Sequence, residues 1–76
     1  MEIGTTCYFC NVVPQCGIYD CEELKVRTVA ANYYVGVNVK TKQATVFTDD
    51  MMDKYVFMHR IDAVEALRNF KGQGDD

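Results

Sequence analysis

The sequence predicts an α+β fold, in which a small antiparallel β-meander of about four or five strands is packed by one C-terminal α-helix. Three observations lead to this prediction. The middle of the chain alternates apolar and polar residues with the period of a strand, the last third carries apolar residues at helical spacing, and short polar segments separate the runs. An N-terminal cysteine cluster adds to this framework.

The length of 76 residues leaves room for one domain. We expect this domain to span residues 1–71, with a cysteine-rich segment at 1–23, the meander at 24–58, the helix at 62–71 and a flexible tail at 72–76. Hydrophobic residues make up 49% of the chain and charged residues 25%, which is typical of a globular protein. Domains this small have marginal cores and often recruit a metal, disulfides or a partner subunit.

The strands of the meander are predicted from alternation. The clearest run is 33–40, where apolar residues at the odd positions alternate with a mostly more polar set at the even positions. Further strands are expected at 24–28, 44–48 and 54–58, because each run is rich in β-branched or aromatic residues.

The C-terminal helix has signals at both ends. Asp62 followed three residues later by Glu65 is a capping-box pattern, and Gly72 after Lys71 is typical of a helix terminus. The apolar residues between them occupy positions i, i+3, i+4 and i+7, and they are Ala63, Ala66, Leu67 and Phe70. This stripe is expected to cover one face of the meander.

Charge and hydropathy exclude several classes of protein. The net charge is −3, and acidic segments at 1–24 and 49–76 flank a basic segment at 25–48, so the chain is not a general polyanion binder. No run approaches the roughly 18–20 apolar residues of a membrane helix, and the N-terminus does not resemble a secretory signal. We therefore expect a cytoplasmic protein with reduced thiols and no membrane partner.

The cysteines are the strongest candidate for a metal site. Their spacing is C-x2-C-x5-C-x4-C, and a turn between the first two can direct both sulfurs at one ion. Asn11 and Gly17, which follow two of the cysteines, tolerate the left-handed backbone that such turns require. The sequence therefore predicts a structural zinc ion, and its ligands would be Cys7, Cys10, Cys16 and Cys21.

Three alternatives for these cysteines stay open. Ribbon-type zinc sites separate their ligand pairs by roughly 15–20 residues, whereas the gap here is five. Apolar residues interleave with the cysteines, so buried free thiols in strands are one alternative. Disulfides are another. A thiol-redox site is the third, but Pro14 prevents the helix that would activate the first thiol of the C-x-x-C pair.

The sequence assembles no catalytic set. The chain has no serine, and its single histidine, His59, is expected at the exposed end of a strand. We therefore predict a non-enzymatic adaptor or inhibitor that binds another protein. Its contact residues are expected in one predicted turn, where adjacent methionines would suit a partner groove, and they are Asp49, Asp50, Met51 and Met52. The alternative is that one methionine plugs the open end of the sheet.

A zinc-stabilised nucleic-acid-binding module that uses segment 25–48 is the second function we consider. Basic side chains would contact phosphates and an aromatic ring would stack on bases, and these residues are Lys25, Arg27, Lys40, Lys42 and Tyr34. Four basic residues can contact only a few phosphates of a nucleic acid. We therefore rank this function second, after protein binding. An unpaired strand at the edge of the sheet also offers a route to a homo-oligomer.

Overall fold

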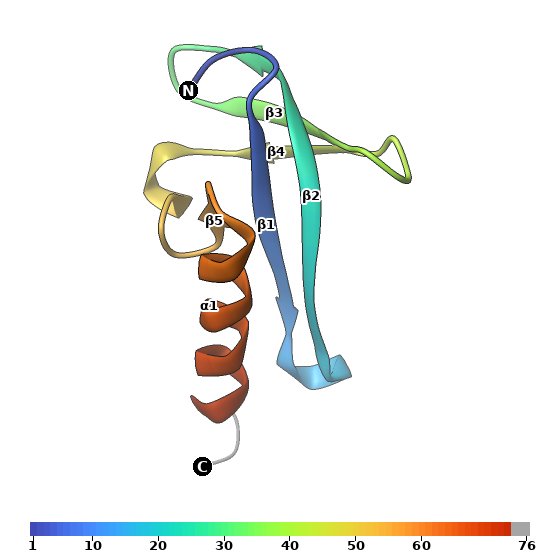
Figure 1. The fold of residues 1–76 in the computed structure, drawn as a ribbon, viewed down its shortest axis with the longest axis vertical. Helices are drawn as coiled ribbons and strands as arrows, with labels where there is room; N and C mark the ends of the chain where they lie inside the picture. The colour runs from blue at the N-terminus through green and yellow to red at the C-terminus, as the bar shows by residue number, and fades with distance from the viewer. Residues whose placement is uncertain (74–76) are drawn as a thin grey trace.

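The structure is a computed structural model, and it describes residues 1–73. In this part of the chain five strands, two short 3-10 helices and one α-helix follow one another (Figure 1). In chain order they are β1 (Thr6–Val13), η1 (Pro14–Cys16), β2 (Ile18–Val29), β3 (Tyr34–Asn38), β4 (Ala44–Phe47), η2 (Asp49–Met51), β5 (Val56–Phe57) and α1 (Arg60–Gln73). The predicted α+β class, with a single C-terminal helix, is confirmed.

All five strands belong to one antiparallel sheet in the order β4-β3-β2-β1-β5. The first four strands form a meander, and the chain then crosses back so that β5 pairs with β1, with Tyr8 opposite Phe57. The segment 1–23, expected as a separate cysteine-rich region, supplies β1 and the first part of β2. Its apolar residues, which interleave with the cysteines, build the longest hairpin of the sheet.

The β1–β2 hairpin carries a core on each of its faces. One cluster contains Cys7, Leu24, Val26, Phe47 and Val56. The second cluster lies under the helix and contains Cys10, Phe57 and Ala63. Figure 1 shows the reason, since α1 lies along the lower half of the hairpin whereas β3 and β4 cross its upper half. The two halves therefore bury opposite faces of the same two strands.

The face of β3 that packs on the first cluster is not the valine-rich one. Gly36 is buried against the side chains of Leu24 and Phe47. On the opposite face Val35 is 9% exposed, Val37 is half-buried, and Val46 of the neighbouring strand β4 is 61% exposed. Alternation therefore located the strand but did not indicate which face is covered.

Helix α1 is longer than the predicted 62–71 at both ends. Its first turn closes with the Ala63 N–H donating to the His59 carbonyl at 3.3 Å, so Asp62 lies inside the first turn instead of capping it. A carboxylate there still interacts favourably with the helix dipole. Gly72 is helical, and the rest of the predicted flexible tail, residues 74–76, lies outside the described residues.

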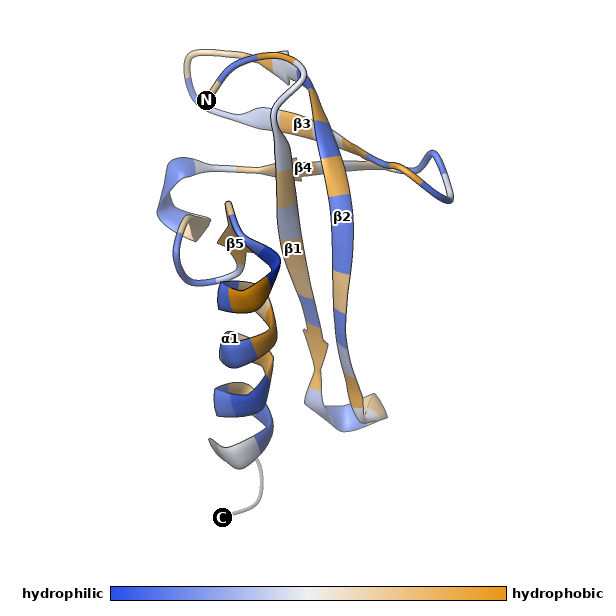
Figure 2. Ribbon diagram, in the orientation of Figure 1, coloured by the Kyte–Doolittle hydropathy of each residue, from blue (hydrophilic) through white to orange (hydrophobic). Residues whose placement is uncertain are grey.

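The predicted apolar stripe of α1 is confirmed. Ala63 is fully buried, and Ala66 and Leu67 pack against the second cluster. Figure 2 shows the hydrophobic residues of the helix on the side that faces β1. Within residues 1–73, no helix combines the length and hydropathy needed to cross a membrane.

Candidate functional site

The four cysteines lie in three different places. Cys7 and Cys10 are three residues apart on β1, so their side chains point to opposite faces, and each belongs to a different buried cluster. Cys21 lies opposite Cys10 on β2 and packs against the second cluster. Cys16 is exposed in η1, at the tip of the hairpin.

This placement does not fit the zinc site predicted from the spacing. In the part of the chain that the structure describes, no group of three or more His, Cys, Asp or Glu side chains is arranged to hold a metal ion. A C-x2-C pair converges on one ion only when its two middle residues form a turn. Here Tyr8 and Phe9 are extended and paired with β2 and β5, which separates the two sulfurs across the sheet.

Burial also makes the thiols poor nucleophiles. It raises the pKa of Cys7 and of Cys10 from 9.0 to about 11, and the nearby charge of the Cys21 thiolate adds to the shift at Cys10. Burial raises the pKa of Cys21 as well, although the positive charge of Arg60 opposes it. Reactive cysteines have lowered pKa values, so none of these three has the activation that a thiol-redox enzyme needs.

The residues predicted to bind a partner, 49–52, form η2 and its C-terminal cap. Met51 and Met52 are half-buried and pack against the first cluster. Asp49 accepts a hydrogen bond of 2.7 Å from the Tyr34 hydroxyl, and Asp50 is exposed. Both methionines therefore contribute to the core, whereas the alternative to partner binding assigned a packing role to only one of them.

The predicted basic residues are divided between two places. Lys25, Arg27 and Lys42 surround an apolar hollow of about 360 Å³, whereas Lys40 lines a different one. Tyr34 is on the other face of β3, where its ring stacks on Phe47 with centroids 5.4 Å apart. The structure thus brings three bases together but separates them from the aromatic ring that was expected to stack on nucleobases.

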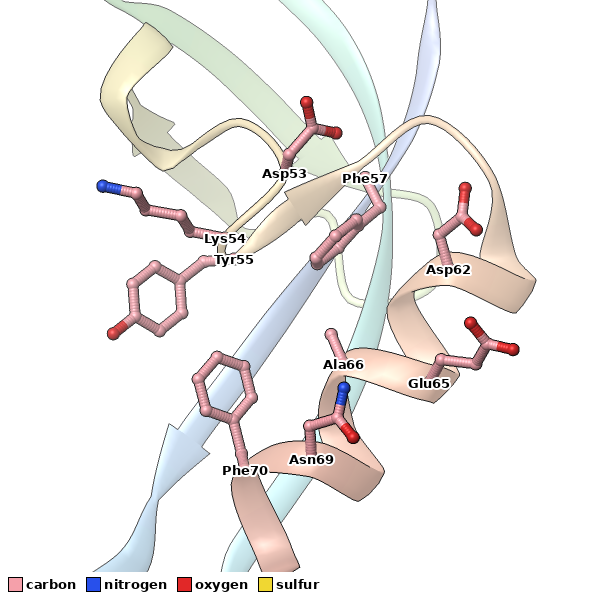
Figure 3. A pocket seen from close by; sticks show the side chains of 9 residues that line it. All are labelled: Asp53, Lys54, Tyr55, Phe57, Asp62, Glu65, Ala66, Asn69 and Phe70. Atoms are coloured by element: carbon pink, nitrogen blue, oxygen red, sulfur yellow. The ribbon is translucent and has the colours of Figure 1, made fainter. Parts of the chain in front are cut away.

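A hollow of about 520 Å³ between β5 and α1 combines aromatic and acidic side chains (Figure 3). We call it the acidic groove, and its lining residues are Asp53, Lys54, Tyr55, Phe57, Asp62, Glu65, Ala66, Asn69 and Phe70. Three carboxylates and one ammonium group give this lining a net charge of −2. Figure 3 shows Phe57 and Ala66 between the acids of the helix and the outer aromatic rings.

The aromatic wall of the acidic groove is a stacked pair. The rings of Tyr55 and Phe70 are nearly parallel, at 4°, with centroids 5.4 Å apart. Phe70 is the last residue of the apolar stripe on α1, and Tyr55, 40% exposed, covers it from the loop before β5. Such a pair presents a rigid π surface beside the negative charges.

A tight turn holds the loop side of the groove. Asp53 has a left-handed backbone with φ of 63°, which aspartate tolerates better than most residues, and its N–H donates to the Val56 carbonyl at 2.8 Å. The Tyr55 N–H donates to the Met51 carbonyl at 2.9 Å, and the Tyr55 carbonyl accepts from the Cys10 N–H. The backbone of Tyr55 is thus fixed from both sides.

The helix side of the groove follows from spacing. Asp62, Glu65 and Asn69 are at positions i, i+3 and i+7 and share one face of α1. The spacing of the two acids predicted a capping box, and the groove was not predicted from the sequence. The polar face of α1 beside Phe70 could have indicated a binding site. It does not indicate that Tyr55 packs against Phe70.

Comparison of the chain with protein-family models, with curated proteins and with solved structures finds no match. The function of the protein is therefore inferred from the geometry of the site.

Proposed function

We propose that the protein is a non-enzymatic adaptor or inhibitor that binds a partner protein through the acidic groove. The docking segment of that partner carries arginine or lysine next to an apolar residue. One observation carries this proposal: three carboxylates and a stacked aromatic pair line the same hollow.

The two kinds of side chain favour the same ligand. A guanidinium or ammonium group over an aromatic face gains about 0.5–1 kcal/mol at an exposed site. The carboxylates of Asp53, Asp62 and Glu65 can accept hydrogen bonds from a basic side chain of the same segment, and an arginine suits a carboxylate best because it donates two bonds in parallel. Phe57 and Ala66 supply apolar area for a neighbouring aliphatic side chain.

The size of the groove limits what it holds. About 520 Å³ is in the range of small ligand pockets, roughly 300–1,000 Å³, so it accommodates one or two side chains of a segment and not a whole domain. Charges at the rim mainly raise the association rate and give specificity. The proposal also places the protein in the cytoplasm, and its four free thiols support that location.

Fluorescence anisotropy with two labelled peptides tests the proposal. One short peptide alternates arginine and leucine, and the other replaces each arginine with glutamate. We expect the protein to bind the first and not the second. Reversing two groove charges with Asp62→Lys and Glu65→Lys should weaken binding by about tenfold or more, with circular dichroism used to confirm the fold.

Asp20→Lys and Glu2→Lys form the matched control, because both acids are exposed and lie outside the groove. This pair changes the net charge by the same amount and should retain most of the affinity. An equal loss in both double variants would mean that binding follows net charge alone. That result, or binding of the glutamate peptide, overturns the proposal.

A further inference from the structure

Cys10 and Cys21 lie directly opposite each other on neighbouring antiparallel strands. Their side chains are on the same face of the sheet, and Cys21 packs on the cluster that buries Cys10. The Cys10 N–H donates to the Tyr55 carbonyl at 2.6 Å, on the β5 side of β1. In an antiparallel strand the N–H and C=O of one residue point to the same side, so the backbone of Cys10 is turned away from β2.

Cys10 and Cys21 are therefore a non-hydrogen-bonded pair. At such positions opposing Cα atoms are about 4.5 Å apart, the closer of the two spacings in an antiparallel ladder. A disulfide requires a Cα separation of roughly 4.4–6.8 Å, with Cβ atoms directed toward each other. The β1–β2 register therefore places Cys10 and Cys21 at positions whose usual Cα spacing falls within this range.

We propose that Cys10 and Cys21 are a modification site, at which oxidation by a small disulfide such as glutathione disulfide joins the two thiols. Half-buried Cys21 reacts first, forming a mixed disulfide and releasing one glutathione thiol. Cys10 then attacks the Cys21 sulfur and releases the second glutathione. The two protein thiols lose two electrons and two protons, one S–S bond forms in the protein, and the S–S bond of the oxidant is reduced.

The geometry excludes the other pairings in the folded chain. Cys7 is on the opposite face of β1 from Cys10 and belongs to the other buried cluster. Cys16 is in η1, beyond the last ladder pair, Val13 and Ile18. That pair is three rows from Cys10 and Cys21, or about 10 Å along the strands. Cys16 thus reaches neither cysteine while the hairpin is paired.

The same disulfide would alter the contact between the sheet and α1. In the reduced chain the Cys10 thiol donates to the Ala63 carbonyl, with 3.5 Å between sulfur and oxygen. Oxidation removes this donor. Ala63 follows Asp62, which lines the acidic groove, so the change occurs next to the groove wall.

The test uses the full chain, incubated with glutathione disulfide at alkaline pH and then digested with chymotrypsin. Cleavage after Phe9 and Tyr19 separates Cys10 from Cys21, so their disulfide links two fragments. We expect a loss of two hydrogen atoms from the intact mass and this linked pair of fragments. The Cys16→Ser variant removes the other cysteine of the first fragment and should still form the link.

Cys21→Ser should lose the link and accumulate only glutathione adducts. Because this side chain is half-buried, circular dichroism must show that the variant folds, and Cys16→Ser remains decisive if it does not. A Cys16→Ser protein that yields only adducts overturns the proposal. So does wild-type protein in which the linked sulfurs are those of Cys16 and Cys21. Neither result depends on the acidic groove.

Discussion

Gly36 of β3 lies so close to Leu24 of β2 that a Cβ atom built on it would approach the Leu24 Cβ to 3.0 Å. The same atom would lie 3.3 Å from Phe47 Cε1. Gly36→Ala should therefore overpack the first cluster and lower the free energy of unfolding by about 1–3 kcal/mol, as measured by urea denaturation. Gly72→Ala is the matched control, because nothing lies within 4 Å of its Cβ position and it is helical. We expect it to raise stability by about 0.5–1 kcal/mol, and a Gly36→Ala protein that gains as much would contradict the packing described here.

Leu24 is fully buried in the first cluster. Leu24→Ala should lower the free energy of unfolding by about 2–5 kcal/mol, because it removes transfer energy and leaves a cavity. Val46→Ala, at a position that is 61% exposed, should change it by less than about 0.5 kcal/mol. Chemical denaturation of the two variants in parallel checks the difference. Equal losses would show that the valine face of β3 and β4 is covered after all.

Chelation of metal ions should leave the protein unchanged. Because the four thiols lie on two faces and in a turn, we expect the reduced protein to have the same melting temperature with and without a strong chelator. Native mass spectrometry should show no zinc ion bound per chain. One zinc per chain together with chelator-induced unfolding would restore the four-cysteine site and require a different fold for residues 7–21.

Stability should fall as the pH rises above 9. The pKa of Cys7 and of Cys10 is 9.0 when exposed and about 11 in the fold, so over this interval the unfolded chain releases protons that the folded chain retains. The contribution of these two thiols to the free energy of unfolding is complete below pH 9 and is lost as the pH approaches 11. Urea midpoints measured across this range test it. Cys7→Ala should make the decline shallower, whereas Val46→Ala, at an exposed position without a titratable group, should not.

Asp49 should control the ionisation of Tyr34. The hydrogen bond from the Tyr34 hydroxyl to the Asp49 carboxylate raises the pKa of Tyr34, because the phenolate could not donate it. Asp49→Asn removes the negative charge and should lower that pKa, followed by NMR titration of the Tyr34 ring. Asp50→Asn changes the exposed neighbouring residue and should leave the pKa of Tyr34 unchanged. A shift of equal size in both variants would mean that the effect is only a matter of net charge.

Local patterns predicted the parts of the fold that depend on one segment alone. The apolar stripe of α1 and the strand at β3 follow from spacing, because a helix and a strand each repeat with a fixed period. The same reasoning failed where the partner of a segment mattered. The C-x2-C spacing of Cys7 and Cys10 is compatible with a metal-binding turn or with a strand, and pairing with β2 and β5 makes it a strand.

The amino-acid sequence by itself determined the α+β class, the positions of the helix and central strands, and the charge of each segment. Only the tertiary structure decided that Tyr55 meets Phe70, that Cys10 faces Cys21, and that Gly36 packs on the first cluster while Val37 beside it is only half-buried. The reason is physical. Periodicity reports the face on which a residue lies, whereas strand register and helix packing determine what that face contacts, and both depend on residues far away in the chain.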